Sequence, residues 1–279
     1  MMNPSQREML EYMLQFTHLE KTLAMYPGAN EATYAGLFRV DEALYHEIKE
    51  RFVVRAREAA QELLAHPNFA ARVDRVPFAR GETVIGVGSS VTDDSQSWFE
   101  ILRHIFALRR PQDDIRFVNA GLSGDSTNHL IARFIDVVRK QPDWIICHIS
   151  SNDGRRHGLS ASKTLVSPEE TEQNLVMLRH YAASQTTAKW LWMTPTTIIE
   201  ERIEANPLLA TNQVDFRNED LAPIAEAVLK QPDLIVNLWP LFGHPADPDL
   251  VLWDGLHPSI KGHMLIVDAL LSQLVQDLQ

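Results

Sequence analysis

The sequence VIGVGSSVTDDSQSW, residues 84–98, decides the fold of this chain. A β-branched run ends in Ser89 and Ser90, and Ser97 then precedes the apolar helical sequence WFEILRHIFAL. This pattern predicts a strand, a tight turn and a helix capped by Ser97. The turn can hold a serine hydroxyl at the carboxyl edge of a sheet, but a Ser-rich loop without chemical function has the same local pattern.

The same alternation of apolar runs and helical patterns continues to the end of the chain. Predicted strands lie at 83–87, 115–120, 143–149, 189–194 and 233–238, and predicted helices at about 97–109, 126–140, 168–184, 213–230 and 258–278. Alternating strands and helices predict an α/β fold of three layers, in which helices cover both faces of a five-stranded, mostly parallel sheet. Ligands bind such sheets at the carboxyl ends of the strands, so the loops there are where we expect chemistry.

The first 80 residues have a different pattern. Apolar residues recur at steps of three and four within 41–65, and Pro27 with Gly28 interrupts an earlier helical stretch. We therefore predict a helical N-terminal extension over residues 1–80 and a catalytic domain over 81–279. The extension has no nucleophile beside a base, so we expect it to pack against the domain. A homo-oligomer contact and a cover over a cleft are its alternative roles.

Composition restricts the class of partner. The 279 residues carry a formal charge of -11 without a block of Lys or Arg, which argues against nucleic acid or an anionic membrane as the main partner. No apolar run reaches the roughly 18 residues of a membrane span, and the amino terminus lacks a signal-peptide pattern, so we expect a cytoplasmic protein. The single cysteine, Cys147, excludes an intramolecular disulfide and is expected to be a buried thiol. His257 and His263 do not converge as metal ligands, and we expect no metal and no cofactor.

Polar residues follow the second and third predicted strands. Gly124 lies in the turn NAGLSGDS, where backbone N–H groups face an approaching substrate oxygen. A phosphate-binding loop is the rival interpretation, but the P-loop lysine and a full dinucleotide fingerprint are absent. Asn152 follows the third strand, where its amide either bonds nearby backbone as a turn residue or stabilises an oxyanion.

The last loop is the most informative. Asp254 precedes His257 by three residues, and Pro258 suits the first turn of the closing helix. An acid in this position can orient the imidazole through Nδ1 and leave Nε2 free as a base. A helix-capping aspartate beside a surface histidine is the more ordinary explanation of this motif alone.

Taken together, the four loops resemble the four sequence blocks of the SGNH, or GDSL-type, hydrolase superfamily over roughly residues 82–270. The resemblance implies a flavodoxin-like SGNH hydrolase fold. It also implies Ser90 as nucleophile, His257 as general base and Asp254 as its orienting partner. The backbone N–H groups of Ser90 and Gly124 and the side chain of Asn152 would then form the oxyanion hole.

The sequence departs from the family pattern in two places. The first block usually reads Gly-Asp-Ser, but Ser89 takes the aspartate position, and Ser150-Ser151 replace the glycines that usually precede Asn152. Neither change removes a reacting group.

The resemblance implies a serine-dependent carboxylester hydrolase, for which we expect short- to medium-chain acyl esters as small-molecule substrates. Carbohydrate O-deacetylation, thioester hydrolysis and lysophospholipid cleavage use the same mechanism and remain alternatives, as does a non-catalytic binding module on this scaffold. The candidate lining of an acyl pocket is Ile198, Trp239, Phe242 and Trp253, although plain packing is the default interpretation of these side chains.

Overall fold

Five parallel strands form the central sheet, in the spatial order β2 (Arg116–Gly121), β1 (Thr83–Gly88), β3 (Trp144–His148), β5 (Lys189–Met193) and β7 (Leu234–Val236). The structure is a computed structural model, and it describes residues 4–158 and 162–276. The predicted five-stranded α/β fold is therefore confirmed, and each observed strand lies within the predicted range or extends it by one residue.

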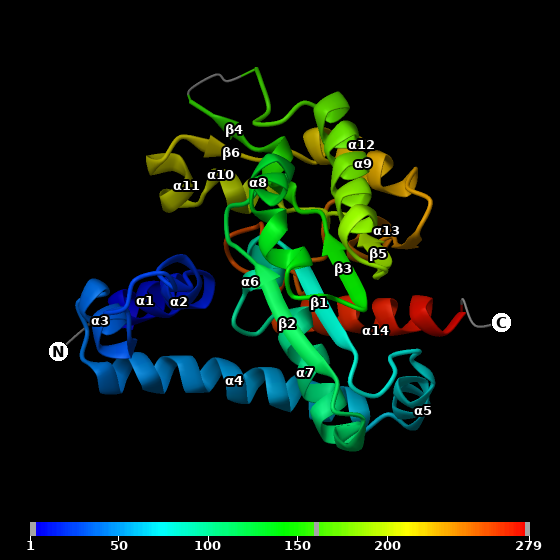
Figure 1. Ribbon diagram of the computed structural model, residues 1–279. Coiled ribbons are helices and arrows are strands. Elements are labelled where there is room, and N and C mark those ends of the chain that lie inside the picture. The colour runs from blue at the N-terminus through cyan, green and yellow to red at the C-terminus, as the bar shows by residue number, and fades with distance from the viewer. Residues whose placement is uncertain (1–3, 159–161, 277–279) are drawn as a thin grey trace.

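Helices cover both faces of this sheet (Figure 1). One face carries α8 (Thr127–Val138), α9 (Pro168–Gln185) and α12 (Asn218–Leu229). The other carries α7 (Trp98–Arg109) and α14 (Ile260–Gln276), on which α4 (Glu42–Leu64) and α5 (Pro67–Arg75) pack. The further elements are α1 (Pro4–Phe16), α2 (Leu19–Thr22), α3 (Glu31–Leu37), α6 (Ser90–Asp93), η1 (Pro111–Asp113), η2 (Ser151–Gly154), β4 (Arg156–His157), α10 (Glu200–Glu204), α11 (Pro207–Thr211), β6 (Val214–Asp215) and α13 (Trp239–Phe242).

Strand residues alternate between the two hydrophobic cores. In β3, Trp144 and Ile146 join the core beneath α7 and α14, whereas Ile145 and Cys147 join the core beneath α8, α9 and α12. Because both faces are covered, every residue of this strand is apolar or buried, as expected for a parallel sheet. Burial of the free thiol of Cys147 is confirmed, and this burial raises its pKa.

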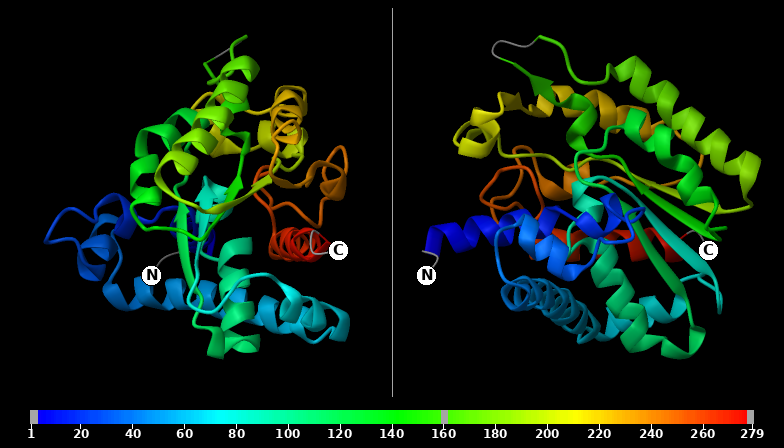
Figure 2. Two further views of the ribbon diagram at one scale, coloured as in Figure 1. Left: turned by 45° about the vertical axis from the view of Figure 1, so that its right-hand side comes forward. Right: turned by 60° about the vertical axis from the view of Figure 1, so that its left-hand side comes forward.

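The N-terminal region is helical, with α1 to α5 within residues 4–75. Its first helices have a small core of their own, formed by Leu10, Leu14, Tyr34, Ala35, Tyr45, Ile48 and Phe52. The second half of α4, together with Phe69 and Val73 of α5, instead contributes to the core beneath α7 and α14. Both views in Figure 2 place α1 close to the carboxyl ends of the strands rather than away from the sheet. The boundary between an extension and a catalytic domain stays a prediction.

Three local expectations differ from the structure. The turn after β1 is the short helix α6, which begins at Ser90. The closing helix begins at Ile260 rather than near Pro258, because Pro258 pairs with Val251 in an isolated bridge. The start of the helix predicted over 213–230 is the strand β6, which pairs with β4 in a small antiparallel sheet.

Candidate active site

Ser90 lies at the point where the first strand of the sheet gives way to helix. β1 ends at Gly88, Ser89 follows, and Ser90 is the first residue of α6. This position directs the hydroxyl toward the last loop of the chain, where Ser90 Oγ lies 2.9 Å from Nε2 of His257. The sequence-predicted nucleophile and base are thus within hydrogen-bond distance.

The turn between Asp254 and His257 gives the carboxylate two separate tasks. Its Oδ1 accepts hydrogen bonds from the backbone N–H groups of Leu256, at 2.9 Å, and His257, at 3.0 Å. Its Oδ2 lies 2.6 Å from Nδ1 of His257. Gly255 makes this turn with a φ of +78°, and a Cβ there would lie 2.5 Å from the carbonyl oxygen of Ile199. Only glycine suits this position.

The surroundings of Asp254 favour its charged form. Asp254 is fully buried, and burial raises its pKa, but the charge and hydrogen bonds of His257 outweigh this effect and the net pKa lies below the ordinary value. An ionised carboxylate only accepts hydrogen bonds, so we assign the ring proton to Nδ1 of His257. Nε2 is then the acceptor that faces Ser90 Oγ, as a general base requires.

His148 and His263 also lie buried in the same part of the fold. Burial, with a smaller contribution from the charge of His263, lowers the pKa of His148 to about 3, so its ring is neutral. His263 accepts from the backbone N–H of Trp98 through Nδ1 and faces Asp94 through Nε2 at 3.2 Å. Of the three, His257 is the histidine that faces the serine hydroxyl.

The two candidate oxyanion donors from other loops lie at the same edge of the sheet, because β2 and β3 both flank β1. Gly124 has a φ of +87°, and no atom lies within 4 Å of the position where a Cβ would be, so there is open space on that side of the residue. Asn152 Nδ2 donates to the carbonyl oxygen of Asp125 at 3.0 Å, and its contact with Ser150 Oγ is longer, at 3.4 Å. The bond to Asp125 therefore fixes the side chain of Asn152. The contact of its amide with Ser150 is the weaker one.

Two carboxylates that the sequence analysis did not single out hold these loops. Asp153 accepts from the backbone N–H and the hydroxyl of Thr127 and from the hydroxyl of Thr171, at 2.7 to 2.8 Å. Asp93, in α6, accepts from the backbone N–H and the hydroxyl of Ser123, beside Gly124. Both are buried, so these bonds fix the loops after β2 and β3 relative to α6 and α9.

Two residues of α1 also reach the site. The Tyr12 hydroxyl donates to Oδ2 of Asp254 at 2.9 Å, and the Phe16 ring stacks on the His257 ring with centroids 4.1 Å apart. Both residues lie in the helical stretch before Pro27, and the sequence analysis assigned no role in the site to either. Only the tertiary fold brings Tyr12 to an acid 242 residues away.

The residues predicted to line an acyl pocket divide into two pairs. Ile198 and Phe242 are buried in the two hydrophobic cores, where they pack against other apolar side chains. Trp239 is partly buried and stacks on His244, and Trp253 is 50% exposed and packs against Tyr12. Only this second pair has surface that a substrate can touch.

Within residues 4–158 and 162–276, no helix is both long and apolar enough to cross a membrane.

The sequence pattern of the GDSL-like lipase/acylhydrolase family matches residues 83–265, which is more than half of the chain. An acetylxylan esterase from Geobacillus stearothermophilus is 29% identical over 217 residues, covering 70% of this chain and 94% of that enzyme.

Solved structures show the same fold. A crystal structure of that acetylxylan esterase superimposes with a TM-score of 0.54 at 24% identity, over 72% of this chain and 96% of the enzyme. An alpha/beta hydrolase from the metagenome of Lake Arreo, Spain, gives a TM-score of 0.54 at 23% identity, over 71% of this chain and 97% of that protein. The family match begins at the first strand, so α1 to α5 lie outside it. The chain belongs to the GDSL-like lipase/acylhydrolase family and is a carboxylic ester hydrolase.

Proposed function

We propose that this esterase hydrolyses short- to medium-chain acyl esters through an acyl-enzyme intermediate on Ser90. The observation that carries the proposal is the continuous line of hydrogen bonds from Ser90 Oγ to Nε2 of His257, at 2.9 Å, and from its Nδ1 to Asp254, at 2.6 Å. Similar arrangements activate serine hydroxyls in many unrelated hydrolases.

In the first step, Ser90 Oγ attacks the ester carbonyl while His257 Nε2 takes its proton. Asp254 stabilises the imidazolium that forms, and the carbonyl oxygen becomes an oxyanion. His257 then protonates the leaving alcohol as the bond between acyl carbon and alcohol oxygen breaks. Water, deprotonated by His257, attacks the acyl-enzyme in the same way and releases the carboxylic acid and free Ser90.

The oxyanion would be held by the backbone N–H groups of Ser90 and Gly124 and by the amide of Asn152. The open space beside Gly124 and the fixed side chain of Asn152 support these assignments. Donors that are already oriented stabilise the transition state without reorganisation at the moment of reaction.

Deacetylation of carbohydrates is the second candidate, as a narrower form of the same reaction. It is favoured by the similarity to the acetylxylan esterase, which extends over nearly the whole length of that enzyme. Structures of that enzyme include catalytic mutants in which a serine, an aspartate or a histidine is replaced by alanine. The same three residue types form the line of hydrogen bonds in this chain.

The test is a comparison of the wild type with Ser90→Ala on p-nitrophenyl acetate, butyrate, octanoate and palmitate. We expect Ser90→Ala to lose hydrolysis of every ester, and the wild-type kcat/KM to be highest on acetate or butyrate. Wild-type activity in Ser90→Ala would refute the mechanism, and a maximum on palmitate would refute the chain length. Acetate release from acetylated xylooligosaccharides, faster than from p-nitrophenyl acetate, would favour the carbohydrate candidate.

A further inference from the structure

Helix α1 lies outside the family match, yet its Tyr12 completes the surroundings of the candidate triad. The Tyr12 hydroxyl donates to Oδ2 of Asp254 at 2.9 Å, and this is the same oxygen that faces Nδ1 of His257 at 2.6 Å. Burial raises the pKa of Tyr12, and the charge and hydrogen bond of Asp254 and the charge of Asp94 raise it further. The phenol therefore stays protonated and remains a donor at any pH at which an esterase works.

Phe16 covers one face of the imidazole. Its ring lies 4.1 Å from that of His257, centroid to centroid, with 28° between the planes, and only 9% of the residue is exposed. Tyr12 packs against Phe16 at 5.2 Å and against Trp253, the neighbour of Asp254, at 5.1 Å. One turn of α1 thus lies directly over the acid and base pair.

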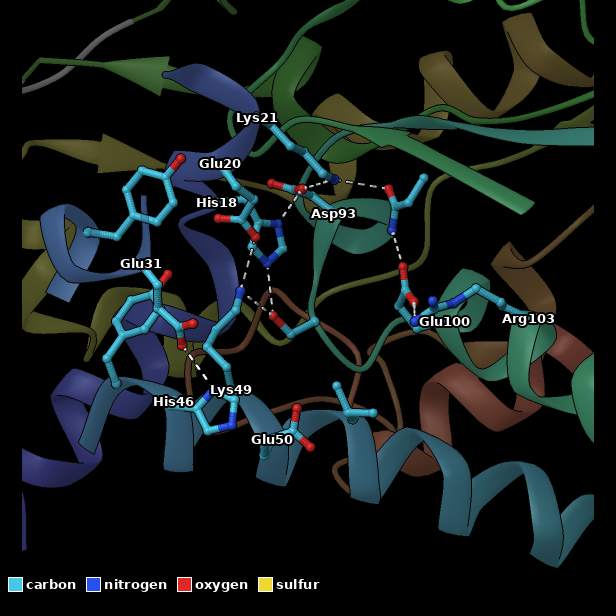
Figure 3. A pocket seen from close by; sticks show the side chains of 15 residues that line it. His18, Glu20, Lys21, Glu31, His46, Lys49, Glu50, Asp93, Glu100 and Arg103 are labelled. Atoms are coloured by element: carbon cyan, nitrogen blue, oxygen red, sulfur yellow. Dashed lines mark hydrogen bonds and ion pairs between the residues drawn. The ribbon is translucent and has the colours of Figure 1, made fainter. Parts of the chain in front are cut away.

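The end of α1 is anchored to the segment that follows the nucleophile. The Gln15 side chain donates to Asp94 at 2.7 Å. The backbone carbonyl oxygen of Gln15 accepts from the backbone N–H of Ser95 at 3.1 Å. His18 and Lys21 both point toward Asp93 in Figure 3, and His18 Nδ1 lies 2.6 Å from the carboxylate. The helix is therefore fixed both to the base and to the nucleophile helix α6.

We propose that α1 is a built-in part of the catalytic apparatus, in which Tyr12 and Phe16 are positioning residues that orient Asp254 and His257. This inference rests on the proposed function, because it assigns a role to residues that act through the triad. Under this proposal α1 contributes to catalysis as well as to packing.

The two side chains should have opposite effects on the stability of the imidazolium form of His257. When His257 takes the serine proton it becomes an imidazolium, which the Asp254 carboxylate stabilises directly and the face of Phe16 stabilises as a cation–π contact. The Tyr12 bond disperses charge on the carboxylate oxygen, so its loss strengthens the attraction between Asp254 and the imidazolium. Loss of the Phe16 ring weakens the stabilisation. Asp94, which forms hydrogen bonds with His263 and Gln15, is the other carboxylate whose charge raises the pKa of Tyr12.

The experiment measures kcat and kcat/KM against pH for the full chain on p-nitrophenyl acetate. Tyr12→Phe removes only the hydroxyl, and Phe16→Leu removes only the aromatic face. The matched control is Tyr45→Phe, since Tyr45 is a buried tyrosine of α4 in the separate core of the first helices. Because the Asp254 carboxylate is then no longer held in one orientation, we expect kcat of Tyr12→Phe to fall about tenfold, the size of one hydrogen bond to a charged group, with KM nearly unchanged.

The acid limb of kcat/KM should move to higher pH in Tyr12→Phe and to lower pH in Phe16→Leu, while Tyr45→Phe should match the wild type. General loosening of the fold would not produce opposite movements. Wild-type kcat and an unmoved acid limb in Tyr12→Phe, with Ser90→Ala inactive, would overturn the role of α1 and leave the proposed function intact. Full activity in Ser90→Ala would overturn both.

Discussion

Asp93 is the residue at which the N-terminal helices, the nucleophile helix and the loop after β2 meet. Its Oδ1 faces His18 Nδ1 at 2.6 Å and Lys21 Nζ, and its Oδ2 accepts from the N–H and hydroxyl of Ser123 at 2.9 and 2.8 Å. The carboxylate is 1% exposed. Asp93→Asn keeps the shape but places an uncharged amide between these donors, so we predict a clear loss of stability.

The size of this loss follows from the pKa of Asp93. Burial raises this pKa, but His18 and Lys21 more than compensate and bring it from 3.8 to about 2. At about 1.4 kcal/mol per unit, the difference contributes about 2 kcal/mol to the free energy of unfolding at neutral pH. Because the folded pKa is the lower one, the contribution is complete above about pH 4 and disappears as the pH falls toward 2.

The assay is urea unfolding followed by circular dichroism, at several pH values from 7 downward. We expect Asp93→Asn to be less stable than the wild type by about 2 kcal/mol at pH 7, with a difference that shrinks below about pH 4. Asp74→Asn is the control, since Asp74 forms an exposed ion pair with Arg109 and such pairs contribute about 1 kcal/mol or less. Equal losses of unfolding free energy in the two variants would refute this reasoning. A loss for Asp93→Asn that does not change with pH would also refute it.

Three further substitutions probe the candidate site. Ser89 Oγ is buried and has no hydrogen-bond partner in the described part of the chain, so Ser89→Ala should keep kcat/KM within a few-fold of wild type and leave thermal stability equal or higher. Asn152→Ala should lower kcat by about 10² to 10³ while the enzyme stays folded, as steady-state kinetics with circular dichroism would show. Gly255→Ala would meet the carbonyl of Ile199, so calorimetry should show a lower Tm and kcat should fall with it. A Ser89→Ala variant as inactive as Ser90→Ala would mean that the wrong serine is assigned.

The centre of the sheet was predictable because β1, β3 and β5 are short apolar runs with both faces buried. In β1, Val84 packs on one core and Ile85 on the other, and such runs can be recognised without knowledge of their partners. The loops of the site were predictable for a related reason, since parallel strands bring their carboxyl ends to one edge. That rule brought the loop of Ser89 and Ser90 to the loop of His257, and the family resemblance then selected Ser90.

Contacts between distant segments were not predictable in this way. The helical period of α1 indicates a buried face, but a period carries no information about what covers it, so Tyr12 and Asp254 could not be paired. The same limit explains Ile198 and Phe242, whose apolar side chains fit a pocket lining and a core equally well. Burial distinguishes the two, and burial depends on the tertiary structure.

The nucleophile loop shows how the local sequence and the N-terminal helices depend on each other. Ser89 occupies the position where the family usually has an aspartate, so no carboxylate lies directly beside Ser90. Carboxylates instead follow Ser90 at Asp93 and Asp94, and both are buried against residues of the first two helices or the segment between them. A buried carboxylate is stable only with such partners, so the anchoring of α6 requires His18, Lys21 and Gln15. The rigidity of the candidate nucleophile is therefore supplied in part by a segment that the family pattern does not contain.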